Sequence, residues 1–251
     1  MCSVSWLIDD NHYQIFFNRD EQKTRAKALP PRVQHMDGMK ILMPIDPVGQ
    51  GSWISTNELG VTLCLLNNYQ GSMPSNVLFS RGLLLKSLSK EESIKGVCEA
   101  FERLTLSQFA PFVLLAFDLS VCRKGDPVVA LTWDGIKSFI KAAEAPLFSS
   151  GVDLLQVSDY RKAAFEQIVG ENRTPDSLLA FHQHHHPTHP HMSVCMHRDD
   201  AETVSFTQVI VTEEQQEMRY IDGLSCVQLT QDALQKNTTL LPSRSALALS
   251  V

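Results

Sequence analysis

The chain has 251 residues, of which 43% are hydrophobic and 20% charged, and its formal net charge is −6 at pH 7. This composition is typical of a globular protein, and the acidic balance without a basic stripe argues against a nucleic-acid binder. No stretch approaches the ~20 apolar residues of a membrane span, and the N-terminus shows no basic leader with a long apolar run, so we expect a cytoplasmic protein.

The first part of the chain is predicted to be rich in β-structure. Two strand-like runs, at residues 3–8 and 13–18, are joined by a turn-rich stretch at residues 9–12. The segment 28–50 is predicted to be irregular because it contains four prolines, Pro30, Pro31, Pro44 and Pro47. A buried strand, GVTLCLLNNY, follows at residues 60–69 and ends at two asparagines.

The rest of the chain alternates between helices and strands. Residues 78–104 have helical periodicity with a break near Ser89, and residues 159–184 predict two helices that are split at Thr174-Pro175-Asp176. Strands are predicted in PFVLLAFD, PVVALTWDG, IKSFI, ETVSFTQVIVT and EMRYIDG, whereas the tail is weakly patterned. The strand connections look like hairpins, so we expect an α+β fold of antiparallel sheets with helices outside, in one domain over residues 1–251.

The first two strands fit a hairpin whose register is fixed by apolar residues. Pairing Trp6 with Ile15 creates a uniformly apolar face, which a slip of one residue would scramble. Continued outward, the same register places Cys2 opposite Arg19, with Asp20 beside the N-terminus.

A cysteine at position two carries both a thiol and a free α-amine once Met1 is removed. The thiol has a reference pKa near ~8.5 and the amine one of roughly 7.7–8.0, so the amine can accept the thiol proton. A nearby Arg19 favours the thiolate, and Asp20 would orient the amine as the third member of a nucleophile–base set. The alternative is that Cys2 is a chance residue at a frayed end and that Arg19 and Asp20 form a surface ion pair.

Two other groups of residues suggest metal or redox chemistry. The tract HQHHHPTHPH at residues 182–191 holds six of the nine histidines; an exposed loop is the favoured interpretation and a metal site the alternative. Cys195 and His197 would be neighbours on a strand, and we favour a core cysteine and a structural histidine over a redox or haem-ligating pair. The six cysteines lack a C-x-x-C pair, so we predict no zinc ribbon or disulfide framework, and no resident metal or cofactor.

Several blocks of the sequence resemble one known family. MCSVSW…FFNRDE resembles the start of the NRDE family, which includes the transport and Golgi organization 2 proteins, and Asn18-Arg19-Asp20-Glu21 is the motif that names it. GSWIST before Gly60, the pair Asn68-Tyr69, and the block SVCMHRDDAETVS with the later YIDG match further segments in order, while residues 78–190 match weakly. The family is similar to the N-terminal-nucleophile hydrolases, which implies a four-layer αββα sandwich.

The resemblance also implies roles for individual residues. In the cysteine branch of these hydrolases, which includes bile salt hydrolase and penicillin V acylase, an N-terminal cysteine attacks a non-peptide amide. Cys2 would then be the nucleophile, Arg19 would support its thiolate and Asp20 its α-amine. Asn68, at a strand end, is the implied oxyanion donor, with Asn67 as the alternative. In this chain the arginine and aspartate are adjacent, and since neighbouring strand residues point to opposite faces, only one of them shares the face of Cys2.

The candidate substrate contacts are Asn18, Trp53, Tyr69, His197 and Arg198. An ordinary core position is the alternative for Trp53. We therefore predict a hydrolase that cleaves a linear amide C–N bond of a small acylated substrate through a thioester on Cys2. The alternative is a non-catalytic protein of lipid or haem homeostasis that binds and traffics a lipid, acyl-CoA or haem in the same cleft. The sequence leaves the oligomeric state open.

Overall fold

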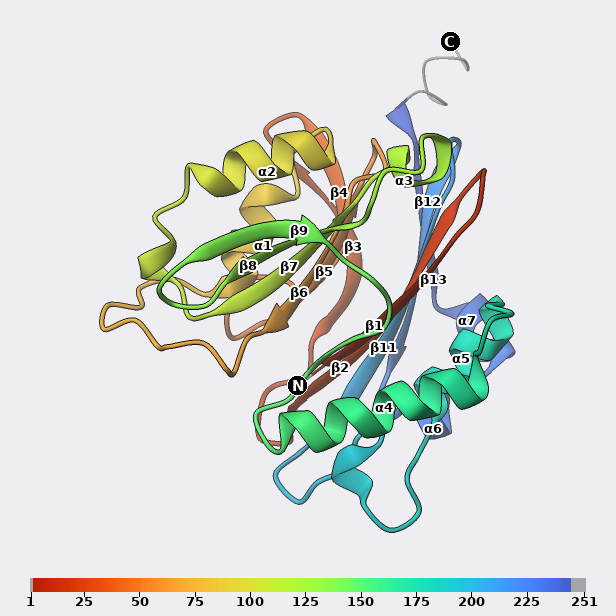
Figure 1. Cartoon of the computed structure of the whole chain (residues 1–251). Coiled ribbons are helices and arrows are strands. Elements are labelled where there is room, and N and C mark those ends of the chain that lie inside the picture. Colours follow the sequence, from red (N-terminus) through yellow and green to blue (C-terminus); the bar gives the residue numbers. More distant parts are fainter. Residues whose placement is uncertain (1, 245–251) are drawn as a thin grey trace.

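The structure, a computed structural model, describes residues 2–244. Within them the chain forms two antiparallel sheets that face each other, with helices on the outer side of each (Figure 1). The strand order is β10-β1-β2-β11-β12-β13 in one sheet and β3-β4-β5-β6-β7-β8-β9 in the other. The predicted α+β, αββα sandwich is confirmed.

The six-stranded sheet combines the start of the chain with its end. Its strands are β1 (Cys2–Ile8), β2 (Tyr13–Gln22), β10 (Leu147–Ser149), β11 (Ala201–Val211), β12 (Gln215–Asp222) and β13 (Thr238–Pro242). The β1–β2 hairpin has the predicted register, with Trp6 opposite Ile15 and Cys2 opposite Arg19. The short outer strands β10 and β13 were not predicted.

The seven-stranded sheet is formed by consecutive strands. They are β3 (Leu29–Met36), β4 (Met39–Ile45), β5 (Ile54–Asn57), β6 (Thr62–Asn67), β7 (Phe112–Phe117), β8 (Val129–Trp133) and β9 (Ser138–Ala142). The last three correspond to the three predicted strands PFVLLAFD, PVVALTWDG and IKSFI.

The prediction that residues 28–50 are irregular was wrong, because β3 and β4 form a hairpin there. Pro30 and Pro31 are tolerated in β3 because it is an edge strand, whose pairing also shifts register between Leu29 and Arg32. The turn is Asp37-Gly38, with positive φ values of 50° and 81°. Asp-Gly is a strong two-residue hairpin signal, which the prediction based on the four prolines did not take into account.

Most helices of the described chain form the outer layers, whereas the short α3 (Ser120–Arg123) lies between β7 and β8 at one end of the sandwich (Figure 1). The helices of the outer layers are α1 (Arg81–Leu88), α2 (Ile94–Glu102), α4 (Leu154–Ile168), α5 (Pro175–Gln183), α6 (Ser225–Gln228) and α7 (Gln231–Lys236). Helices α1 and α2 contact the seven-stranded sheet, whereas α5, α6 and α7 contact the six-stranded sheet and α4 packs on α5. The predicted breaks are confirmed, with Ser89 ending α1 and Thr174 capping α5. No helix within residues 2–244 is long and apolar enough to span a membrane.

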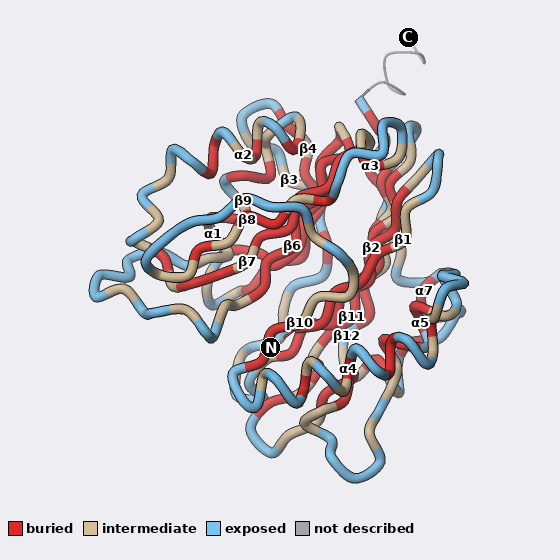
Figure 2. The backbone as a smooth tube through the Cα atoms, in the orientation of Figure 1, coloured by how far each residue is buried: buried red, intermediate tan, exposed pale blue. Residues whose placement is uncertain are grey.

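Strand β2 is buried on both faces because it lies in the middle of the sandwich (Figure 2). Phe17 belongs to the core between the two sheets, where Trp6 packs edge-on against Phe117 with ring centroids 5.4 Å apart. Phe16, its neighbour in sequence, packs with Phe206 under the helices. Successive residues of β2 therefore face two different environments, and this alternation continues into Asn18-Arg19-Asp20-Glu21.

Candidate active site

Cys2 lines a cavity of about 210 Å³ at the end of the sandwich where β1 begins. The cavity takes residues from both sheets and from the start of α1, and it is lined by Cys2, Arg19, Asp20, Glu21, Arg25, Asp46, Gly51, Ser52, Trp53, Leu65, Asn67, Ser80, Arg81 and Gly82. Gly51 and Gly82 are in close contact, since a Cβ on Gly51 would lie 2.2 Å from the backbone carbon of Gly82. This contact brings the first turn of α1 to the cavity wall.

Cys2 occupies the first position of β1 and is only 8% exposed. Its backbone pairs with Arg19 on one side and with Ser149 on the other. Burial raises the pKa of the Cys2 thiol, although a hydrogen bond with the Asp20 backbone and the charge of Arg19 act in the opposite direction. The thiol therefore needs a base to become a nucleophile near neutral pH.

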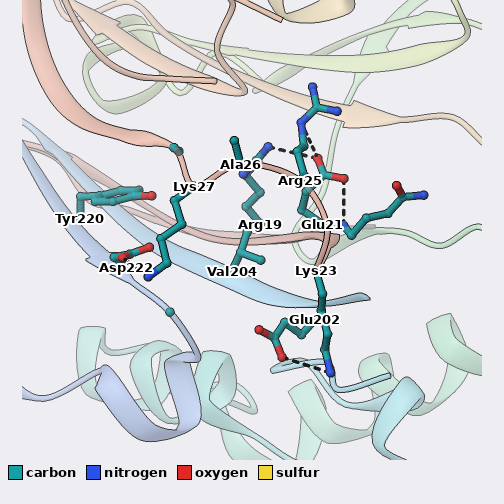
Figure 3. Close-up of a pocket in the computed structure, with 13 residues that line it drawn as sticks. Arg19, Glu21, Lys23, Arg25, Ala26, Lys27, Glu202, Val204, Tyr220 and Asp222 are labelled. Carbon is teal, nitrogen blue, oxygen red and sulfur yellow. Dashed lines mark hydrogen bonds and ion pairs between the residues drawn. The ribbon is translucent and has the colours of Figure 1, made fainter. Parts of the chain in front are cut away.

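Arg19 is held in the cavity by stacking and by an ion pair. Its Cζ lies 4.2 Å from the centroid of the Trp53 ring, and its Nη2 donates to Glu21 Oε2 at 3.1 Å. Arg25 also approaches this carboxylate, with 3.5 Å between its Nε and Glu21 Oε2. Figure 3 shows Arg19, Glu21 and Arg25, which also line a second hollow beside the Cys2 cavity. The volume of this hollow is about 130 Å³. Cation–π stacking and pairing together fix the guanidinium beside Cys2.

The side chain of Asp20 lies on the face of β2 opposite to that of Arg19 and points toward the helices, although Asp20 still lines the end of the cavity. Its carboxylate is buried, accepts a hydrogen bond of 2.6 Å from Thr203 Oγ1 and lies 3.9 Å from Arg161 Nη2. Thr203 lies opposite Asp20 because the β2–β11 register shifts between Thr203 and Ser205. Burial raises the pKa of the Asp20 carboxyl, and the positive charge of Arg161 acts in the opposite direction.

The two candidate oxyanion donors lie in different places. Asn67 lines the Cys2 cavity and its Nδ2 donates to Tyr69 Oη at 2.9 Å. Asn68 lines a neighbouring hollow of about 60 Å³, which includes Ser149, and its Nδ2 faces the Trp133 carbonyl oxygen at 3.4 Å. Asn67, the alternative, therefore lines the Cys2 cavity as well as the neighbouring hollow, whereas Asn68 lines only the neighbouring hollow.

The residues predicted to contact the substrate also lie in different places. Trp53 lines the Cys2 cavity, is 6% exposed, and its Nε1 has no hydrogen-bond partner among the described residues. Tyr69 lines the adjoining hollows rather than the cavity itself.

Asn18 does not fit a role in substrate binding, because it lies on the helix-covered face and is fully buried there. Its Nδ2 donates to the carbonyl oxygens of His182 and Val194 at 2.9 and 3.0 Å and to Ser225 Oγ at 3.2 Å. Asn18 therefore ties the sheet to the segments that cover it.

His197 and Arg198 lie outside the Cys2 cavity as well. His197 contacts Cys195 and Cys226, whereas Arg198 donates two hydrogen bonds to Asp200 across a partly exposed surface. Arg198 lines a hollow that also includes Asp20 and is therefore near the site without facing the thiol.

Three arginines in or near the site were not predicted from the sequence: Arg25, described above, Arg161 and Arg81. Arg161 is completely buried and donates to Ser3 Oγ at 2.8 Å as well as approaching Asp20; the available signal was a charged residue on the apolar face of a helix, between Val157 and Phe165. Arg81 lines the cavity and donates to the Pro111 carbonyl oxygen at 2.8 Å, and burial lowers its pKa. No local sequence signal pointed to Arg81.

Comparison with known proteins agrees with this description. The sequence profile of the family described as Transport and Golgi organisation 2 matches residues 1–223, while no curated protein matches the chain by sequence. A Caenorhabditis elegans N-acylethanolamine-hydrolyzing acid amidase ortholog has a similar structure, with a TM-score of 0.54 and 12% identity over 96% of this chain and 100% of that one. A mutant conjugated bile acid hydrolase from Clostridium perfringens gives a TM-score of 0.48 and 12% identity, with 97% of each chain covered. The similarity to the amidase ortholog, with its TM-score above 0.5, shows that the fold is that of the N-terminal-nucleophile amidases.

Proposed function

Because the chain belongs to the Transport and Golgi organisation 2 family and has an N-terminal-nucleophile amidase fold, we propose that it is a cysteine amidohydrolase acting on a small acylated amine. The observation that carries the proposal is the position of Cys2. It begins β1, lines the cavity between the sheets and lies opposite Arg19. Removal of Met1 would put an α-amine on the same residue.

The reaction would proceed through a thioester. The α-amine of Cys2 takes the thiol proton, and the thiolate attacks the amide carbonyl carbon, with the oxyanion held by the Asn67 side chain. The C–N bond then breaks, and the leaving amine takes the proton from the α-ammonium group. Water, deprotonated by the α-amine, attacks the thioester, releases the acid and restores the Cys2 thiol. A properly placed oxyanion donor contributes roughly 2.7–4 kcal/mol to transition-state stabilisation.

The lining of the cavity supports a substrate with a polar or anionic group near the amide. Arg19 is paired with Glu21, and Arg25 with Asp46, but Arg81 forms no ion pair within residues 2–244. A partly buried cation without a carboxylate is costly unless a bound group completes its interactions. Trp53 lines the same cavity, and its buried Nε1 has no hydrogen-bond partner among the described residues.

One observation favours the second candidate, a non-catalytic protein that binds an acyl lipid, acyl-CoA or haem. Burial raises the pKa of the Cys2 thiol, so without the free α-amine the thiol remains protonated near neutral pH and does not attack. The two functions therefore differ in whether Met1 is removed and whether Cys2 becomes acylated.

The test uses full-length protein whose Met1 has been removed by methionine aminopeptidase, incubated with a panel of N-acyl amides that differ in acyl length and in the charge of the amine. We expect hydrolysis of at least one amide and a mass increase equal to its acyl group on Cys2. Cys2→Ala should lose both, and Cys98→Ala, a substitution in α2 outside the cavity, should keep both. Processed protein that shows neither activity nor acylation, yet binds acyl-CoA or haem equally with and without Cys2, would establish the second candidate.

A further inference from the structure

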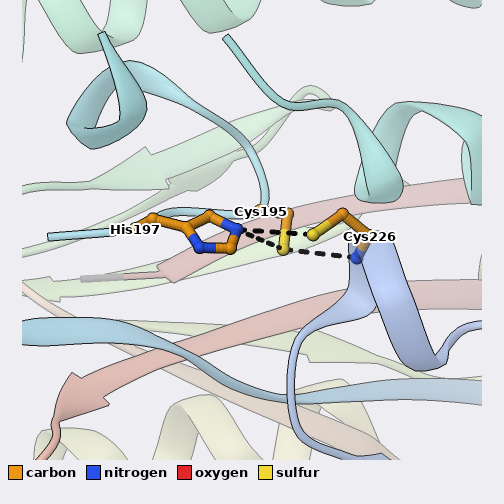
Figure 4. A group of neighbouring side chains, drawn as sticks. All are labelled: Cys195, His197 and Cys226. Carbon is orange, nitrogen blue, oxygen red and sulfur yellow. Dashed lines mark hydrogen bonds between the residues drawn. The ribbon is translucent and has the colours of Figure 1, made fainter. Parts of the chain in front are cut away.

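A cluster of two thiols and one imidazole lies outside the Cys2 cavity (Figure 4). Cys195 and His197 belong to the segment before β11, and Cys226 belongs to α6. His197 Nε2 lies 3.7 Å from Cys195 Sγ and 3.3 Å from Cys226 Sγ, and the three ligand atoms all lie within 4.8 Å of one another. Segments from different parts of the chain thus point three potential metal ligands at one place.

These separations are close to those of a metal-binding set. Zinc–sulfur and zinc–nitrogen bonds of about 2.3 and 2.0 Å place neighbouring tetrahedral ligands about 3.5–3.8 Å apart. Both sulfur–nitrogen distances in the cluster lie at or near this range. In addition, the backbone N–H of Cys226 donates to Cys195 Sγ at 3.3 Å, an arrangement that orients a sulfur ligand and stabilises its thiolate.

We propose that Cys195, His197 and Cys226 bind a zinc ion, independently of the proposed amidase function. Two thiolates and one imidazole are a ligand set that suits Zn²⁺. On binding, both thiols release their protons to solvent and His197 binds through Nε2. His197 also lines a surface hollow together with His191 and Arg198, and a solvent molecule from this hollow would complete the tetrahedron.

The place of the cluster in the fold gives the ion a structural role. It would join the segment 194–198 to α6, which follows β12 on the same side of the six-stranded sheet. Between the two ligands of that segment, the Met196 backbone N–H donates to Thr203 Oγ1 at 2.8 Å, and Thr203 Oγ1 donates to Asp20. Zinc would thus stiffen the segment that supports Asp20, without contacting the cavity.

The histidine tract provides a competing explanation for any metal binding. His189 is exposed and His186 is half-buried, and the centroids of their rings lie 4.8 Å apart, so the tract can capture metal on its own. His185 packs against His197 with ring centroids 4.5 Å apart, but it is not part of the three-residue cluster. The experiment must therefore separate the cluster from the loop.

The test uses untagged, reduced, full-length protein, stripped of metal and titrated with Co²⁺ and then Zn²⁺. We expect one Co²⁺ per chain, a near-ultraviolet thiolate-to-cobalt charge-transfer band, the intense visible bands of tetrahedral cobalt, and displacement of all of them by Zn²⁺. Cys226→Ser should abolish the charge-transfer band and weaken Zn²⁺ binding by more than the roughly 10–100-fold that follows loss of a group that only orients a ligand. The double variant His186→Ala/His189→Ala should keep both signals.

Two results would overturn the proposal. The first is wild-type protein that shows no charge-transfer band, a readout that does not depend on how well any variant folds. The second is a band that disappears in the loop variant and persists in Cys226→Ser, which would assign the binding to the histidine tract. Circular dichroism of the metal-free variants checks that each retains the wild-type secondary structure.

Discussion

The two faces of β2 at Asn18-Arg19-Asp20-Glu21 differ in what their side chains do. Toward the cavity, Arg19 and Glu21 pair with each other, and Arg19 stacks on Trp53. Toward the helices, Asn18 and Asp20 are buried in hydrogen bonds and an ion pair with segments that lie far along the chain. Within this short motif, Arg19 and Glu21 therefore line the cavity, whereas Asn18 and Asp20 bind the sheet to the layer that covers it.

This division implies that substitutions on the helix-covered face mainly affect stability, whereas those on the cavity face mainly affect the chemistry of Cys2. The four residues are contiguous, so sequence proximity alone would assign them a common role. The alternation of side chains along a strand separates them.

The largest effect on stability is expected from Arg161→Met. The substitution removes the positive charge of Arg161 from beside the buried Asp20 carboxylate and should lower the free energy of unfolding by about 3–5 kcal/mol, measured by urea denaturation at pH 7. Adding Asp20→Asn, which removes the buried negative charge, should restore part of the loss. If Arg161→Met alone lowers the free energy of unfolding by less than about 1 kcal/mol, the ion pair of Arg161 and Asp20 does not stabilise the helix-covered face.

Asn18→Ala should have the next largest effect. It removes the donor shared by the carbonyl oxygens of His182 and Val194 and by Ser225 Oγ, and buried groups that lose a partner cost about 1–3 kcal/mol each. We expect a loss of roughly 2–3 kcal/mol in the same urea assay. Asn11→Ala, in the exposed β1–β2 turn, is the matched control and should change stability little.

The helix-covered face should also make the protein sensitive to acid through His182. Burial lowers the pKa of His182 to about 3, below its unfolded value of about 6.5. The folded state thus holds the neutral ring, so stability is full above pH 6.5 and falls as the pH drops from 6.5 toward 3. The loss approaches ~1.4 kcal/mol per pH unit, or about 2 kcal/mol between pH 6.5 and 5. His182→Gln should lack this contribution. If the free energy of unfolding of that variant depends on pH as in the wild type, His182 is not the source of the acid sensitivity.

The smallest effect on stability is expected on the cavity face, from Arg19→Met. Glu21 keeps Arg25 as a partner, so the free energy of unfolding should fall by less than about 1 kcal/mol. The rate of Cys2 alkylation at pH 7 should nevertheless fall by about tenfold, equivalent to one pKa unit, because the thiolate loses a nearby positive charge. A large loss of stability in Arg19→Met without a change in the alkylation rate of Cys2 would show that the cavity face contributes to stability rather than to the chemistry of Cys2, and would contradict the proposed difference between the two faces.

The part of the site that could be predicted from sequence is the part encoded locally. The apolar alternation of β1 and β2 permits one register only, and that register places Cys2 opposite Arg19. The same alternation puts Arg19 and Asp20 on opposite faces of β2. The two helix pairs were predictable as well, since their periodicity and caps are local signals.

The rest depends on how distant segments pack, which no local pattern specifies. Arg161 reaches Asp20 only because α4 packs beside α5 on the helix-covered face, and Cys226 contacts Cys195 only because α6 packs against β11 and β12. Asn67 rather than Asn68 faces the cavity because β6 ends at Asn67, and Asn68 then turns toward Trp133. These positions follow from tertiary packing rather than from propensity.

The most direct test of the central claim is the pH dependence of Cys2 alkylation in protein whose intact mass shows that Met1 has been removed. The proposed mechanism predicts that Cys2 reacts near neutral pH and faster than the other five thiols, because its own α-amine accepts the proton and Arg19 stabilises the thiolate. Retention of Met1 in the native protein, or a Cys2 rate that rises only at alkaline pH as expected for a buried thiol without a base, would contradict an amidase and leave a binding protein.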